Sequence, residues 1–154
     1  MKEVFQGHCM CGDVRFEAVG KPKWILWCHC ESCRRHSGAP ASVFVSFADD
    51  TVSITQGEIA KYESSPGVER GFCARCGATL TCSNPRLPNE THFHVGAFER
   101  AADLTPTGAF FAEKRLPWFD HDRVPSLDSL RLRRSHLHEI TIRAVKLRVR
   151  IPNN

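Results

Sequence analysis

Seven of the eight cysteines in this 154-residue chain fall into three short clusters, and this arrangement restricts the fold more than any other feature. The clusters are CMCG at 9–12, CHCESC at 28–33 and CARCG at 73–77. The sequence shows neither a run of about 20 apolar residues nor an apolar leader, so we expect a cytoplasmic protein. Because thiols rarely form disulfides in a reducing cytosol, the clusters predict metal ligation.

The first and last clusters have the spacing of a closed zinc site, which takes four tetrahedral ligands that are commonly thiolates. Cys73 and Cys76 form a CxxC turn followed by Gly77. Cys9 and Cys11 are two residues apart, and in an extended segment such residues point to the same side. We therefore expect these four cysteines to bind one structural zinc that joins the start of the chain to its middle.

The middle cluster offers three thiolates, from Cys28, Cys30 and Cys33, and three ligands do not fill a tetrahedron. Catalytic zinc sites use three protein ligands and keep the fourth position open for water or substrate. A zinc ion held by three sulfurs also suits the capture of a soft thiol. The sequence thus predicts a catalytic zinc on this triad.

A fourth protein ligand would instead close this second site and make it structural. The candidates for that ligand are Cys82, His29 and His36. Cys82 otherwise has the character of a buried, inert thiol, and His29 that of a local hydrogen-bonding group.

Alternating apolar residues predict short strands that are separated by turns rich in glycine, proline and aspartate. The expected strands lie at 14–18, 42–47, 51–56, 77–82 and 92–98, and one helical turn is expected at 99–104. We expect a mainly β domain of short antiparallel strands, held together by metal rather than by a large continuous core.

The net charge of +4 is a property of the C-terminal end. Residues 129–154 contain seven Lys or Arg and one Glu, whereas the preceding residues carry 14 bases and 16 acids. We therefore expect no broad nucleic-acid-binding face. Val145, Leu147 and Val149 alternate with basic residues, which predicts a strand. The predicted division is a zinc domain at 1–128 and a basic, strand-forming extension at 129–154.

Longer stretches around the three clusters resemble the glutathione-dependent formaldehyde-activating enzyme family, also described as centromere-protein-V-like. The strings that carry the resemblance are GHCMCGDVRFEAVG, CHCESCRRHSGAP, GFCARCGATL, HVGAFERAADLTP and FFAEKRLPWFDHDRVP. They cover about residues 5–125, in the family's order and spacing. The resemblance implies a mainly β, Mss4-like (β-tent) fold. It also implies one structural and one catalytic Zn²⁺ per chain, on the same ligand sets as above.

The resemblance further implies a carbon-sulfur lyase that acts on a small thiol adduct. The family's named reaction joins glutathione and formaldehyde to S-hydroxymethylglutathione. Arg34 and Arg35 follow the triad and could pair with a carboxylate of such a thiol, or lie on the surface as solvated cations. Phe110 stands about where many relatives have a histidine.

The three tryptophans have two readings. Trp24, Trp27 and Trp118 either wall a substrate pocket or belong to the core.

The alternative function is a non-enzymatic zinc scaffold that binds a protein or a nucleic acid through the basic extension. We expect no membrane partner, and association of the chain into a homo-oligomer is left open.

Overall fold

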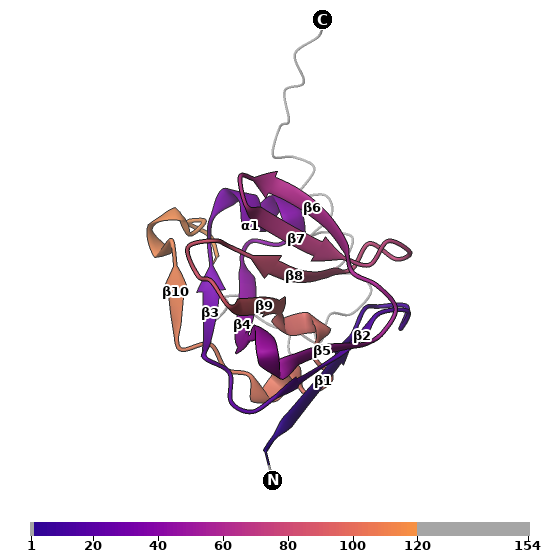
Figure 1. The fold of residues 1–154 in the computed structure, drawn as a ribbon. Helices are drawn as coiled ribbons and strands as arrows, with labels where there is room; N and C mark the ends of the chain where they lie inside the picture. Colours follow the sequence, from indigo (N-terminus) through magenta and orange to yellow (C-terminus); the bar gives the residue numbers. More distant parts are fainter. Residues whose placement is uncertain (1, 120–154) are drawn as a thin grey trace, which may run out of the picture. The chain divides into compact units, whose positions relative to one another are not determined.

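The computed structural model describes residues 2–119, which form two β-sheets and one α-helix (Figure 1). The chain divides into two compact units, and the first ends at Leu116. One sheet has three antiparallel strands in the order β1-β2-β5, which are β1 (Val4–His8), β2 (Arg15–Val19) and β5 (Val52–Gln56).

The larger sheet has seven strands in the order β10-β3-β4-β9-β8-β7-β6. Its strands are β3 (Trp24–Cys28), β4 (Ser42–Ala48), β6 (Ala60–Ser65), β7 (Val68–Phe72), β8 (Thr79–Ser83), β9 (Glu90–His94) and β10 (Gly108–Phe110). Strand β10, orange in Figure 1, pairs in parallel with β3, and the other pairs are antiparallel. Four 3-10 turns complete the elements: η1 (Asp49–Thr51), η2 (Val95–Ala97), η3 (Ala101–Asp103) and η4 (Ala112–Lys114).

Aromatic side chains from both sheets form the main core. The ring of Phe16 on β2 stacks on that of Phe93 on β9, with centroids 4.1 Å apart. Phe98 contacts both rings edge-on, at 5.1 and 5.8 Å. Since offset and edge-to-face aromatic pairs add to the stabilisation from burial itself, this cluster fixes the two sheets against each other.

Helix α1 (Glu31–Ser37) connects β3 to β4 and was not expected from the sequence. Its N-cap is Cys30, whose sulfur accepts a hydrogen bond from the amide of Cys33. The helix ends at Gly38, which has the left-handed φ of 65° common at helix C-termini. A cysteine of the predicted metal site thus also serves as the helix cap, which couples the triad to the local fold.

One row of side chains crosses five strands of the large sheet on the face opposite Phe93. Directly paired positions carry their side chains on the same face of a sheet. The pairs along β3, β4, β9, β8 and β7 are Trp24 with Ser46, Ser46 with His92, His92 with Cys82, and Cys82 with Arg70. This polar row is buried, with no member except Trp24 above 7% exposure.

The expected mainly β architecture is confirmed, as are the strands in the first four predicted segments. The fifth segment is only half right, because the strand ends at His94 and the chain turns into η2. The helical turn at 99–104 is present as η3. The domain boundary at 128 and the strand in the extension lie outside the described residues. Within 2–119, no helix is long and apolar enough to cross a membrane.

Candidate metal centres and the adjoining cavity

The structure brings Cys9, Cys11, Cys73 and Cys76 together, with all four sulfurs within 4.8 Å of one another. The sulfurs of Cys9 and Cys11 are 3.5 Å apart, and those of Cys11 and Cys73 are 3.8 Å apart. Tetrahedral zinc with Zn–S bonds of about 2.3 Å separates its sulfurs by about 3.8 Å. The four-sulfur set therefore fits a closed zinc site.

Two matching backbone turns present these four sulfurs. The amide of Cys9 bonds the carbonyl of Val14, and the amide of Cys73 bonds that of Ala78, each at 3.0 Å. A glycine with positive φ lies inside each turn, Gly12 at 80° and Gly77 at 72°, where a side chain would be strained. These turns leave amides free for sulfur, as in the bond from Val14 N to Cys9 Sγ at 3.3 Å.

The triad is assembled from the end of β3 and the start of α1. The sulfurs of Cys28, Cys30 and Cys33 lie within 4.8 Å of one another, and those of Cys28 and Cys33 are 3.5 Å apart. Hydrogen bonds from the Cys28 and Cys33 thiols lower the pKa of Cys30 to about 2. The same contacts raise the pKa of Cys28, because one thiolate is stabilised by neighbours that stay protonated. A dication could bring all three to the thiolate form.

None of the three candidates for a fourth ligand joins the triad among the described residues. The set of side chains that could hold a metal ion here consists of the three cysteines of the triad and does not include Cys82, His29 or His36. Cys82 is buried at 7% exposure, and burial raises the pKa of its thiol to about 11. The burial predicted for the Cys82 thiol agrees with the structure.

A cavity of about 570 Å³ opens beside the triad. Its apolar wall consists of Trp24, Phe44, Val68, Leu87, Phe110 and Phe111. Its polar lining includes the triad itself, Arg70, Cys82, Arg86, His92 and Lys114. A three-sulfur set facing a cavity of this size, with apolar walls and a few polar groups, has the composition of a small-molecule site.

Arg70 is the residue of this site that sequence reasoning missed most completely. It is 5% exposed, and its Nη1 lies 3.6 Å from the sulfur of Cys33. Burial alone would lower the pKa of the guanidinium, but the hydrogen bond to Cys33 and the neighbouring sulfurs raise it above its usual value. Nothing local in the sequence distinguishes Arg70 from the other arginines.

His92 is the single imidazole among the described residues that line this cavity. Behind it, Glu90 Oε1 lies 3.7 Å from its Nε2, and Glu90 Oε2 accepts a hydrogen bond from Ser46 and pairs with Lys23. Burial lowers the pKa of His92, although Glu90 opposes this shift. Burial raises the pKa of Glu90, but its bonds to Ser46 and Lys23 outweigh that effect and lower it.

The two arginines that follow the triad have partners elsewhere. Arg34 Nη1 donates to the carbonyl of Lys114 at 2.9 Å, and Arg35 forms an ion pair with Glu31 one helical turn earlier. The exposed cations that line the cavity are instead Arg86 and Lys114. Within residues 2–119 neither has an ion pair, and Lys114 Nζ lies 5.2 Å from the Phe111 ring centroid.

One of the three tryptophans fits the prediction of a pocket wall, and none of them is a buried core residue. Trp24 lines the cavity, with its ring 4.8 Å from that of His92 and 5.5 Å from that of Phe110. Trp27 stacks against His29 at 6.3 Å, and Trp118 belongs to the second unit and is 65% exposed.

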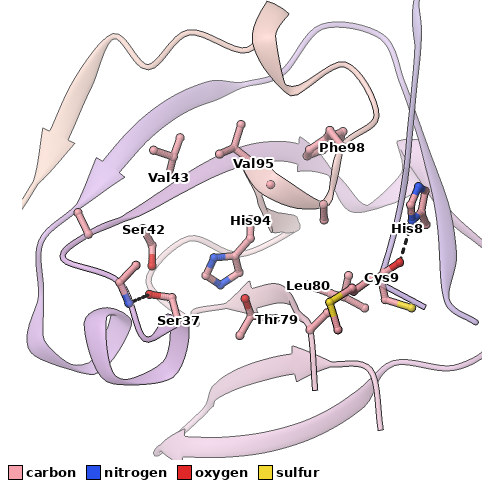
Figure 2. Close-up of a pocket in the computed structure, with 16 residues that line it drawn as sticks. His8, Cys9, Ser37, Ser42, Val43, Thr79, Leu80, His94, Val95 and Phe98 are labelled. Atoms are coloured by element: carbon pink, nitrogen blue, oxygen red, sulfur yellow. Dashed lines mark hydrogen bonds between the residues drawn. The ribbon is translucent and has the colours of Figure 1, made fainter. Parts of the chain in front are cut away.

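A second cavity of about 520 Å³ has a different chemistry. Figure 2 shows the imidazole of His94 directed into it, with Ser42 and Thr79 nearby. Burial lowers the pKa of His94 to about 3, so this ring is neutral at physiological pH. No Asp, Glu, Lys or Arg is among the described residues that line this cavity. It therefore offers no counter-charge to an anionic ligand, unlike the cavity at the triad.

These features define a mainly β protein with two cysteine sets that could each hold a metal ion, and all three cysteines of the triad line a cavity that also carries charged groups. The family model of the glutathione-dependent formaldehyde-activating enzymes matches residues 4–114, and the chain belongs to this family. The resemblance of the three cysteine clusters to that family is thereby confirmed.

Two relatives are each 34% identical to the chain. An uncharacterized lyase of Schizosaccharomyces pombe matches over 101 residues, which are 66% of this chain and 73% of that protein. A protein of Halomonas elongata, named for the glutathione-dependent formaldehyde-activating enzymes, matches over 106 residues, 62% of this chain and 66% of its own length. A Rhodobacter sphaeroides crystal structure is similar in fold, with TM-score 0.57, 20% identity and coverage of 68% of this chain and 99% of that one.

Proposed function

We propose that the chain is a zinc-dependent carbon-sulfur lyase that makes and cleaves the adduct of a small thiol and an aldehyde, with S-hydroxymethylglutathione as the adduct to test first. The observation that carries the proposal is the three-sulfur set of Cys28, Cys30 and Cys33 beside a cavity of about 570 Å³. Three sulfurs leave one position of a tetrahedral ion for a ligand from outside. The family and the names of the two relatives support the same chemistry.

In cleavage of a thiol–formaldehyde adduct, the C–S bond breaks, the hydroxyl loses its proton and a C=O bond forms. The sulfur keeps the electron pair of the broken bond, and it takes up a proton when the free thiol leaves. A zinc ion on the triad would act as a Lewis acid and lower the pKa of the thiol. His92 lines the cavity, with Glu90 Oε1 3.7 Å from its Nε2, and would hold the hydroxyl proton.

The charged groups of the cavity suit a thiol that carries carboxylates. Arg86 and Lys114 are exposed cations on two separate segments of the lining, the loop before β9 and turn η4. Glutathione has two carboxylates, and each could pair with one of these cations. The apolar wall of Trp24, Phe44 and Phe110 would exclude water from the reacting carbon.

The rival reading, a non-enzymatic zinc scaffold, requires a closed second site. The described residues place three sulfurs there and no fourth ligand, which favours the enzyme.

A matched pair of cysteine variants tests this function. Cys30→Ser removes one sulfur of the triad, and Cys82→Ser changes a thiol of the same cavity that lies outside the set. We expect Cys30→Ser to lose turnover of glutathione and formaldehyde, followed by NMR, and to keep one zinc per chain. Cys82→Ser should retain both zinc ions and turnover. Turnover by Cys30→Ser at the wild-type rate would rule out the triad as the catalytic site.

A further inference from the structure

Arg70 is a buried cation without a carboxylate partner among residues 2–119. Its Nε donates to Ser64 Oγ at 2.9 Å, and its Nη1 contacts Cys33 Sγ at 3.6 Å. None of the ion pairs formed by the described residues includes it. A buried charge is costly unless an opposite charge or a strong hydrogen bond compensates it.

The available anions are the sulfurs of the triad. Three thiolates around a dication carry one net negative charge, which equals in size the single positive charge of the guanidinium. The guanidinium reaches this centre directly, because Arg70 Nη1 lies 3.6 Å from Cys33 Sγ and a hydrogen bond between a cation and an anionic acceptor is stronger than one between neutral groups.

The fold holds Arg70 firmly in this place. It lies inside β7, opposite Tyr62 of β6 and Cys82 of β8 in the register, so the strand that carries it is paired on both sides. The side chain lines the cavity and contacts Cys33 of α1. An outer partner on a rigid element is the kind that orients a metal ligand and tunes its donor strength.

We propose that Arg70 is the counter-charge of the triad: it contacts Cys33 from a buried position and offsets the excess negative charge of the three-sulfur metal centre. It is a positioning residue, which acts on the metal through Cys33. The inference rests on the proposed function, because it takes the triad to be a metal site.

The test measures the affinity of the full chain for its second zinc, by competition with a chromogenic chelator. Arg70→Gln removes the charge and keeps a side chain that can hydrogen-bond, and Arg70→Lys keeps the charge. Arg75→Met is the matched control, since Arg75 is an exposed arginine that pairs with Asp13 beside the four-cysteine set. Ser64→Ala removes the hydrogen bond from Arg70 Nε to Ser64 Oγ. It shows whether Arg70 acts only by stabilising the local structure.

We expect Arg70→Gln to bind the second zinc about 10- to 100-fold more weakly, the usual range for loss of an outer partner, and to keep the first zinc. Arg70→Lys should recover most of that loss, and the two controls should match wild type. In the cobalt-substituted protein, the sulfur-to-metal charge-transfer band of Arg70→Gln should shift to longer wavelength, because Cys33 loses its cationic neighbour and becomes more electron-rich.

Wild-type zinc affinity and an unshifted cobalt band in Arg70→Gln would overturn the inference, and so would an equal loss of affinity in Ser64→Ala. If Arg70→Lys bound the second zinc as weakly as Arg70→Gln does, the charge of Arg70 would not be the property that matters, and the inference would again be overturned. These results leave the proposed function standing if wild type binds two zinc ions and turns over. A wild-type chain with one zinc would instead defeat the proposed function.

Discussion

Reversing the charge of Arg86 or Lys114 should weaken the binding of a carboxylate-bearing thiol without slowing the chemical step. Both cations line the cavity, and within residues 2–119 neither forms an ion pair. Arg86→Glu and Lys114→Glu each place a negative charge where the substrate is expected to bring one.

The size of the effect follows from the exposure of these side chains. Two unit charges about 4 Å apart attract by about 1 kcal/mol in water, and reversing one turns this into repulsion of similar size. Screening at physiological salt leaves roughly 1 to 2 kcal/mol per site, which is about a fivefold to thirtyfold rise in KM. Because these contacts exist in the ground state and in the transition state alike, kcat should not change.

The assay compares glutathione with 2-mercaptoethanol, a thiol without carboxylates, each with formaldehyde and at two salt concentrations. KM should rise only for glutathione, and the rise should shrink at high salt. Lys21→Glu is the control, since Lys21 is an exposed cation in the turn between β2 and β3. An unchanged KM for glutathione, or an equal rise for both thiols, would refute this assignment of the two cations.

Three further outcomes are expected. Phe93→Ala should lower the free energy of unfolding by about 3 to 5 kcal/mol, measured by urea denaturation, because Phe93 is fully buried against Phe16; a loss below about 1 kcal/mol would contradict its place in the core. Glu90 has a pKa below its usual 4.5, so its ionised form stabilises the fold above that pH and the stabilisation is lost as pH falls through the lowered value. The stability advantage of wild type over Glu90→Gln should therefore disappear in acid, and an advantage independent of pH would contradict the network. His92→Gln should lower kcat more than it changes KM, whereas a purely raised KM would assign His92 to binding.

The grouping of the cysteines into a set of four and a set of three could be predicted, because the spacing within each cluster carries this information locally. A CxxC turn or two cysteines in an extended segment converge on one ion whatever the rest of the chain does. The structure brings together the same four and three sulfurs that the spacing grouped. The strands in 42–47 and 51–56 could be predicted for the same reason, since the alternation of apolar and polar residues is a local pattern.

Contacts between residues that lie far apart in the sequence could not be predicted in this way. Arg70 meets Cys33 because β7 pairs with β8 and α1 packs across the same sheet face, and neither contact leaves a mark within a few residues of Arg70. His92 and Trp24 meet through two strand pairings. Helix α1 was not predicted because its N-cap is Cys30, which the sequence pattern assigned to metal binding and not to helix capping. Arg34 and Arg35 were near the triad in sequence, yet the helix turns them to other partners.

The central claim is that one of two zinc ions keeps an open position, and the sulfur coordination number measures this directly. X-ray absorption at the zinc edge of the fully loaded chain should give an average of 3.5 sulfurs per zinc, since the structure groups four cysteines in one set and three in the other. Addition of glutathione should raise the average to 4 sulfurs, and Cys82→Ser should behave like wild type. Four sulfurs per zinc before any thiol is added, or no increase after it, would contradict the account.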